Sequence, residues 1–237
     1  MAPSDIPTSR QSSSTVRAPL WHTLLFLLYL LVPISRWPGA RTVILRIQGP
    51  AALKIYVVET LFQLIGIGFV GTGLYLTATP ARELIGRQWT KVRDAIRDVW
   101  LGILFWLLAI GLSVFSYFVL GASYDRPSRV LPKTSLDLLI FVPFATIAGI
   151  CEEVMFRGYL FKQFKSLTGS MEAALVLQAV VFSAAHGYDQ TISGVINNFM
   201  FAIAFGILAI WRQSLLPGII AHVWLDVSVG ISTVLFP

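Results

Sequence analysis

The chain has 237 residues, of which 56% are hydrophobic and only 13% are charged, and its mean hydropathy is +0.74. This composition excludes an ordinary water-soluble globular domain and predicts an all-α, polytopic transmembrane helical bundle, in which each span needs roughly 20 apolar residues. The formal net charge of +6 does not indicate nucleic-acid binding, because the Lys and Arg residues stand between apolar runs rather than in one basic patch. The lone Cys151 excludes an internal disulfide.

The N-terminal residues 1–18 are rich in Ser, Thr and Pro and show no apolar periodicity, which predicts a disordered tail. The first apolar run follows at 19–35. It could be a signal peptide because Arg10 and Arg17 precede it, but no small-residue cleavage pattern stands at its end. A retained first helix is therefore predicted.

Six further apolar runs bring the predicted number of spans to about seven, at 53–77, 99–120, 136–160, 171–185, 192–211 and 215–235. The charged segment between the second and third spans alternates at helical spacing, which is typical of an amphipathic surface helix or of a solvated linker helix. More Lys and Arg residues fall on the side of the N-terminus, which favours a cytoplasmic N-terminus. Close helix packing, including packing with a second copy, is indicated in the second span by Gly66, Gly68, Gly71 and Gly73.

Ionisable residues inside the apolar runs are candidate functional residues, because each costs about 2.5–3.5 kcal/mol on membrane insertion. In the fourth span, Glu153 and Arg157 stand four residues apart and are expected to form an ion pair. Glu152 is rotated by about 100° and has no partner within its own helix, which leaves it available for acid–base chemistry. The structural alternative is that Glu152 forms a second ion pair.

The other candidates lie in the fifth and seventh spans. His186 follows Phe182 by four residues at the end of the fifth span, where a lone histidine can also be an ordinary interfacial residue. His222 and Asp226 are again four residues apart, so the carboxylate could accept a hydrogen bond from the imidazole and select its tautomer, or the pair could serve packing alone. The clustering of all these groups within one part of the chain favours one shared site.

Three motifs in this region resemble those of the CAAX protease and bacteriocin-processing family (CPBP, also called the Abi family) of intramembrane glutamic endopeptidases. The resemblance covers about residues 136–235. The motifs are two glutamates, three residues and an arginine; a phenylalanine, three residues and a histidine; and a histidine, three residues and an asparagine or aspartate after Pro-Gly. They appear here as Glu152-Glu153-Val154-Met155-Phe156-Arg157, Phe182-Ser183-Ala184-Ala185-His186, and Pro217-Gly218 followed by His222-Val223-Trp224-Leu225-Asp226.

The resemblance implies a helical membrane core in which Glu152, helped by His186, activates a water molecule for attack on a peptide carbonyl without a covalent intermediate. His222 and the residue at position 226 would stabilise the oxyanion. Members with asparagine at that position can donate a hydrogen bond, whereas an ionised Asp226 cannot. We therefore expect Asp226 to orient His222.

The resemblance further implies that Glu153 and Arg157 orient the site and that no metal or other cofactor is bound. The expected partners are a peptide or lipidated protein that enters from the bilayer, and membrane lipids. A lipid-accessible opening near Glu152 and a location in the plasma membrane are expected, with residues 19–135 adding N-terminal helices to a catalytic core at 136–237. The predicted catalytic residues are Glu152, Glu153, Arg157, His186, His222 and Asp226.

Three other functions are compatible with the sequence. Glu152, His186 and His222 could supply a two-histidine, one-carboxylate zinc site, although the HExxH motif is absent. A non-proteolytic immunity or peptide-binding protein would show the same motifs. A transporter would use Glu59 and Asn197-Asn198 as polar groups at membrane depth, but no internal repeat supports this reading.

Overall fold

The structure is a computed structural model that describes residues 18–35, 51–120, 131–187 and 192–236. The predicted disordered tail lies outside these ranges except for its last residue. Ala18 is buried, and its backbone exchanges two hydrogen bonds with the Gln163 amide, at 3.0 and 2.8 Å. The chain entering the first helix is therefore held against the C-terminal half of the protein.

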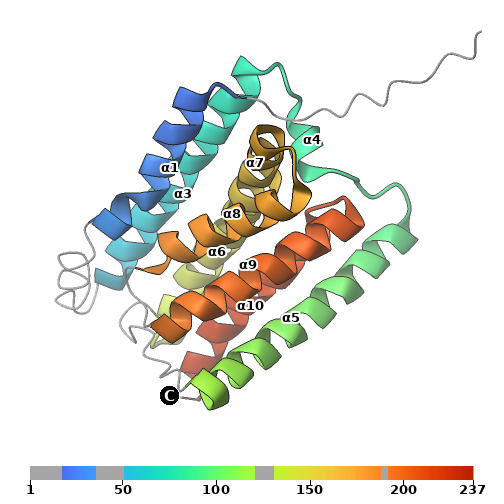
Figure 1. Cartoon of the computed structure of the whole chain (residues 1–237). Helices are drawn as coiled ribbons and strands as arrows, with labels where there is room; N and C mark the ends of the chain where they lie inside the picture. The colour runs from blue at the N-terminus through green and yellow to red at the C-terminus, as the bar shows by residue number, and fades with distance from the viewer. Residues whose placement is uncertain (1–17, 36–50, 121–130, 188–191, 237) are drawn as a thin grey trace, which may run out of the picture.

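The described chain forms a helical bundle, which confirms the predicted fold class (Figure 1). A helix occurs at each of the seven predicted spans. In chain order the helices are α1 (Leu20–Ser35), α3 (Ala51–Leu76), α4 (Ala81–Ile85), α5 (Val92–Leu120), α6 (Ser135–Glu152), the π-helix η1 (Glu153–Leu160), α7 (Phe161–Thr168), α8 (Met171–Ala185), α9 (Ile192–Arg212) and α10 (Leu216–Leu235).

The helices at the seven predicted spans differ in length. Five described helices are long and apolar enough to cross a membrane, namely α3, α5, the continuous rod α6–η1–α7, α9 and α10. The other two predicted spans, α1 and α8, have 16 and 15 residues within the described ranges. The charged segment before α5 is also split, because α4 ends at Ile85 and the remainder forms a turn and the first turns of α5.

The rod α6–η1–α7 runs through the bundle (Figure 1), where α3 packs against α6, and α10 against α6 and α5. Thr134 and Asp137 start the rod with a reciprocal capping box. Past Glu152 the backbone becomes π-helical, and the Phe161 N–H donates to the Phe156 carbonyl five residues back. Such wider turns within a helix are frequent at functional sites.

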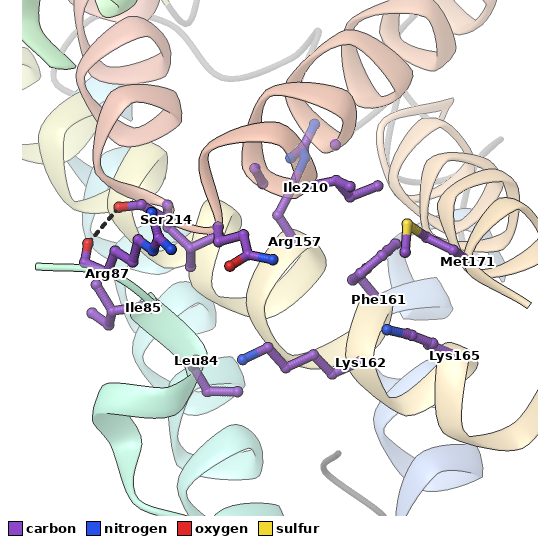
Figure 2. A pocket seen from close by; sticks show the side chains of 15 residues that line it. Leu84, Ile85, Arg87, Arg157, Phe161, Lys162, Lys165, Met171, Ile210 and Ser214 are labelled. Carbon is purple, nitrogen blue, oxygen red and sulfur yellow. Dashed lines mark hydrogen bonds between the residues drawn. The ribbon is translucent and has the colours of Figure 1, made fainter. Parts of the chain in front are cut away.

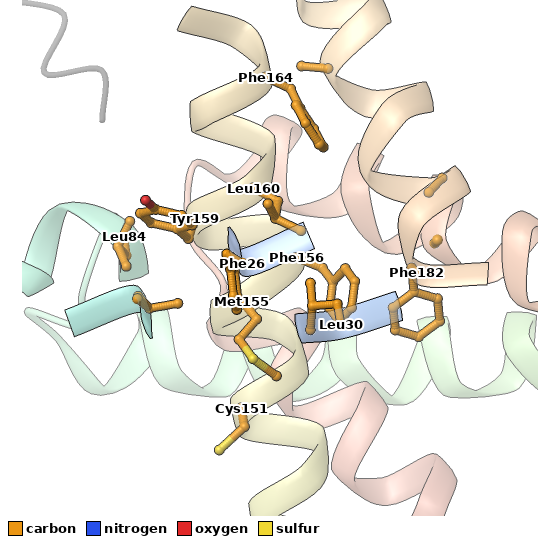
Figure 3. Packing of buried hydrophobic residues seen from close by; sticks show 14 of the residues in the cluster. Phe26, Leu30, Leu84, Cys151, Met155, Phe156, Tyr159, Leu160, Phe164 and Phe182 are labelled. Carbon is orange, nitrogen blue, oxygen red and sulfur yellow. The ribbon is translucent and has the colours of Figure 1, made fainter. Parts of the chain in front are cut away.

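The main core lies where α1, α3 and α8 meet η1 (Figure 3). Two of the four predicted packing glycines are used inside the chain, because a Cβ at Gly66 or Gly73 would collide with Met155 or Tyr159 of η1. Gly68 and Gly71 meet nothing within 4 Å. Thus half of the glycine pattern seats α3 against η1, and packing with a second copy stays a prediction.

Candidate active site

Glu152, the last residue of α6, lies at the junction of four helices and is 9% exposed. Its Oε1 accepts a hydrogen bond from Gln63 Nε2 of α3 at 2.8 Å. Its Oε2 lies 3.5 Å from His186 Nε2, just after α8, and 3.6 Å from His222 Nε2 of α10. One carboxylate therefore has a fixed oxygen on one side and two imidazoles on the other.

Glu153 occupies the next position and is fully buried. Its Oε1 lies 3.1 Å from Arg157 Nη1 and 3.0 Å from His222 Nδ1, so the predicted Glu153–Arg157 pair is present and also holds the histidine. The Arg157 guanidinium lies over the Phe182 ring, 4.3 Å from its centroid. Burial of an arginine is tolerable when both a carboxylate and an aromatic face contact it.

Hydrogen-bond partners select the tautomers of both histidines. His186 Nδ1 is 2.7 Å from the Phe182 carbonyl, and a carbonyl can only accept, so Nδ1 carries a proton. The same reasoning gives His222 a proton on the Nδ1 that faces the Glu153 carboxylate. The Nε2 atom of each histidine therefore faces Glu152. This nitrogen carries a lone pair when the imidazole is neutral and a proton when it is positively charged.

Asp226 lies beside His222, at the ring nitrogen opposite to the one that Glu153 contacts. The short contact to His222 Nδ1 is made by Glu153, and Asp226 Oδ2 lies 3.8 Å from the other ring nitrogen, Nε2. The four-residue spacing does bring the carboxylate beside its histidine, but η1 passes on the Nδ1 side of the ring. His222 therefore stands between two carboxylates, one at each ring nitrogen.

Small and aromatic residues shape the surroundings of these polar groups. Gly218 leaves space for Glu153, since a Cβ there would lie 3.0 Å from Glu153 Oε2. Gly149 lets α6 approach the backbone of α10 at Val223, which a Cβ would meet at 3.1 Å. The Phe182 ring contacts both His186 and His222, with centroids 4.4 and 6.3 Å away. The site is consequently polar at its centre and apolar at its walls.

Gln63 is the site residue that sequence reasoning missed. It is 7% exposed and comes from the N-terminal helices, to which no role in the site was assigned. The available signal was an amide inside the 26-residue apolar helix α3, one turn after Glu59. Of the residues considered for transport, Asn197 accepts a hydrogen bond from Ser116 at 3.1 Å and so links α9 to α5.

Within the ranges that the structure describes, no group of three or more His, Cys, Asp or Glu side chains is arranged to hold a metal ion. A chelator experiment distinguishes the zinc site from the metal-free site that the resemblance implies.

The fold and the site together define a polytopic membrane protein with a buried glutamate–histidine centre. Residues 134–228 match the family model described as type II CAAX prenyl endopeptidase Rce1-like. Over these residues the chain is similar to the CAAX protease family, in agreement with its three motifs, and at the family level this supports a CAAX-type intramembrane protease. The matched segment contains the six predicted site residues and leaves out Gln63. Comparisons with curated proteins and with solved structures gave no match.

Proposed function

We propose that this chain is an intramembrane endopeptidase that hydrolyses a peptide bond in a membrane-associated, CAAX-type substrate. The observation that carries this proposal is the convergence of Glu152 Oε2 with the Nε2 atoms of His186 and His222, at 3.5 and 3.6 Å. These separations are longer than direct hydrogen bonds, and they suit three groups that share a proton or a water molecule.

In the proposed reaction Glu152 acts as general base. It takes a proton from a water molecule that His186 helps to position, and the water oxygen attacks the peptide carbonyl carbon. The carbonyl C=O becomes an oxyanion, and the C–N bond then breaks as the proton held by Glu152 passes to the amine nitrogen. Gln63 donates to Oε1 and so leaves Oε2 as the oxygen that exchanges the proton.

His222 is the proposed donor to the oxyanion. With a proton on each ring nitrogen it donates through Nδ1 to Glu153, which leaves Nε2–H to stabilise the negative oxygen. An ionised Asp226, 3.8 Å from Nε2, supports this role because it favours the positively charged imidazole. Asp226 thereby contributes without donating a hydrogen bond itself.

The proposed substrate reaches the site from the bilayer. The site lies within a bundle that has five helices long and apolar enough to cross a membrane, and its walls are aromatic, which suits a lipidated peptide. Membrane lipids are the proposed surroundings, and the plasma membrane is the proposed location. The proposal includes a lipid-accessible opening beside Glu152, through which the substrate enters.

The test is cleavage of prenylated and unmodified membrane peptides by the purified chain in detergent, with and without a chelator. We expect cleavage of the prenylated peptides that the chelator leaves unchanged. Loss of cleavage on chelation, with recovery on adding Zn²⁺, would instead identify a zinc peptidase built on the same residues. Peptide binding without cleavage by folded protein would contradict the proposal in favour of an immunity or peptide-binding role.

Gln63→Leu is expected to lower kcat by about 10- to 100-fold with little change in KM, since groups that orient a reacting side chain typically have effects of that size. The substitution removes the donor to Glu152 Oε1 and frees the carboxylate to rotate away from the histidines. Steady-state kinetics on one prenylated peptide would measure this.

The matched control is Thr72→Val, on the same helix, whose hydroxyl donates to the Gly68 carbonyl of its own helix at 2.9 Å. It should leave both constants unchanged. Equal activity of Gln63→Leu and wild type would show that Glu152 is held in place by the histidines alone.

A further inference from the structure

A cavity of about 490 Å³ lies beside Arg157, between α4, α7 and the ends of α9 and α10 (Figure 2). Its lining includes four basic side chains, from Arg87, Arg157, Lys162 and Lys165, and no aspartate or glutamate from the part of the chain that the structure describes. Glu152 does not line it. A cavity of this size with convergent cations has the character of a site for an anionic ligand.

Arg157 provides the strongest indication of a ligand. It is 3% exposed, and its Nε and Nη1 have no hydrogen-bond partner among the described residues, although Nη1 lies 3.1 Å from Glu153 Oε1. A buried guanidinium N–H without an acceptor is costly, so Nε is a candidate contact for a bound group. An anion with planar paired oxygens would fit the fork of the guanidinium.

Two of the other cations are available to such an anion. No ion pair is found for the Arg87 or Lys165 side chain within the described ranges, whereas Lys162 Nζ donates to the Glu83 carbonyl. The wall that carries Arg87 is held in place, because Arg87 N–H donates to the Gln213 carbonyl at 2.8 Å and Ser214 Oγ donates to the Arg87 carbonyl at 2.8 Å (Figure 2). Gly86 permits this close approach with φ of 78°.

A series of side-chain contacts links the cavity lining to the proposed reaction centre. Arg157 contacts Glu153, Glu153 contacts His222, and His222 lies 3.6 Å from Glu152. Along the rod, Arg157 and Lys162 follow Glu152 by five and ten residues, which places them about one and two helical turns beyond the reaction centre. An extended peptide of three residues spans about 10 Å, which is the order of two helical turns along this rod.

We infer that this basic cavity binds the C-terminal carboxylate of the peptide that is cut off, so that the enzyme measures the distance from the scissile bond to a free chain end. The inference rests on the proposed function, in which a CAAX-type substrate has three residues after its cysteine. A peptide end is a single extended chain that terminates in a planar, two-oxygen anion, and it can reach the buried Arg157 where a bulkier group would not.

The experiment compares a prenylated peptide ending in a free carboxylate with the same peptide ending in a carboxamide. In nanodiscs of phosphatidylcholine, we expect the amide to be cleaved with a kcat/KM about 10- to 100-fold lower, mainly through KM, because a charge-assisted contact is lost. The variant Arg87→Gln/Lys165→Gln should lower cleavage of the acid and leave cleavage of the amide unchanged. The matched control is Lys91→Gln, an exposed lysine outside the cavity.

Equal cleavage of acid and amide by wild type would overturn the carboxylate site while leaving the endopeptidase proposal intact. Binding of both labelled peptides to the Glu152→Gln variant gives a readout that does not need catalysis. Tighter binding of the acid, lost in Arg87→Gln/Lys165→Gln, supports the cavity even if no cleavage is seen. Equal binding of the two peptides, with loss of phosphatidylglycerol binding in the double variant, would assign the cavity to a lipid headgroup and overturn the inference.

Discussion

Replacement of Glu152 by glutamine is expected to reduce kcat for a prenylated peptide by about 10²- to 10⁴-fold, the range associated with loss of a general base. The fold should tolerate this change. The glutamine oxygen can still accept from Gln63 Nε2, and its amide nitrogen can donate toward the Nε2 lone pair of His186. Only the ability to accept a proton from water is removed. Single-turnover cleavage, together with the melting temperature in detergent, would measure both effects.

The control for this substitution is Glu172→Gln, which removes a carboxylate that lies outside the site and is hydrogen-bonded to Ser170 at 2.8 Å. It should leave kcat unchanged. If the Glu152→Gln protein kept a normal melting temperature and cleaved at more than about a tenth of the wild-type rate, Glu152 would not be the base. The chemistry would then have to be assigned to His186 or to Asp226.

Glu153→Leu is expected to destabilise the protein by about 3–5 kcal/mol, because it leaves the buried Arg157 charge without its carboxylate. His222 also loses the acceptor at Nδ1, so cleavage should be lost as well. The two effects have different origins, and a second variant separates them. In Glu153→Leu/Arg157→Met the unpaired charge is gone, and most of the lost stability should return, since apolar replacement of a buried pair is often neutral.

Cleavage should not return in the double variant, because His222 still has no partner to orient it. Unfolding by a denaturing detergent titration would measure the stability, and the matched control is Asp94→Asn, which breaks an exposed 3.6 Å pair with Arg97 and should change stability little. Recovery of cleavage together with stability would show that Glu153 only neutralises Arg157. A Glu153→Leu variant as stable as wild type would contradict the assigned pairing.

Helix placement was predictable because the apolar runs are long and each corresponds to a helix. Span lengths were less predictable. The runs at α1 and α8 are flanked by polar or turn-forming residues, and hydropathy cannot say whether such a run crosses the membrane or ends part-way against its neighbours. The same limit applies to the segment before α5, where charge alternation was visible but the break after Ile85 was not.

The polar site was predictable as a set of residues, because charged groups are rare in apolar helices and stand out there. Their pairing was predictable only within one helix. Glu153 and Arg157 were expected to pair from their four-residue spacing, and they do. The partner of His222 Nδ1 was not predictable, because Asp226 and Glu153 are equally good acceptors and only the passage of η1 beside α10 selects Glu153.

The sequence by itself determined that this is a helical membrane protein, that six ionisable residues in its second half are concentrated enough to form a site, and that their motifs resemble those of the CAAX protease family. Only the tertiary structure decided that Gln63 holds Glu152, that Gly66 and Gly73 seat α3 on η1, and that four cations line a cavity beside Arg157. The reason is physical. Composition and spacing act along one helix, whereas these contacts join residues far apart in the chain and depend on how the helices pack.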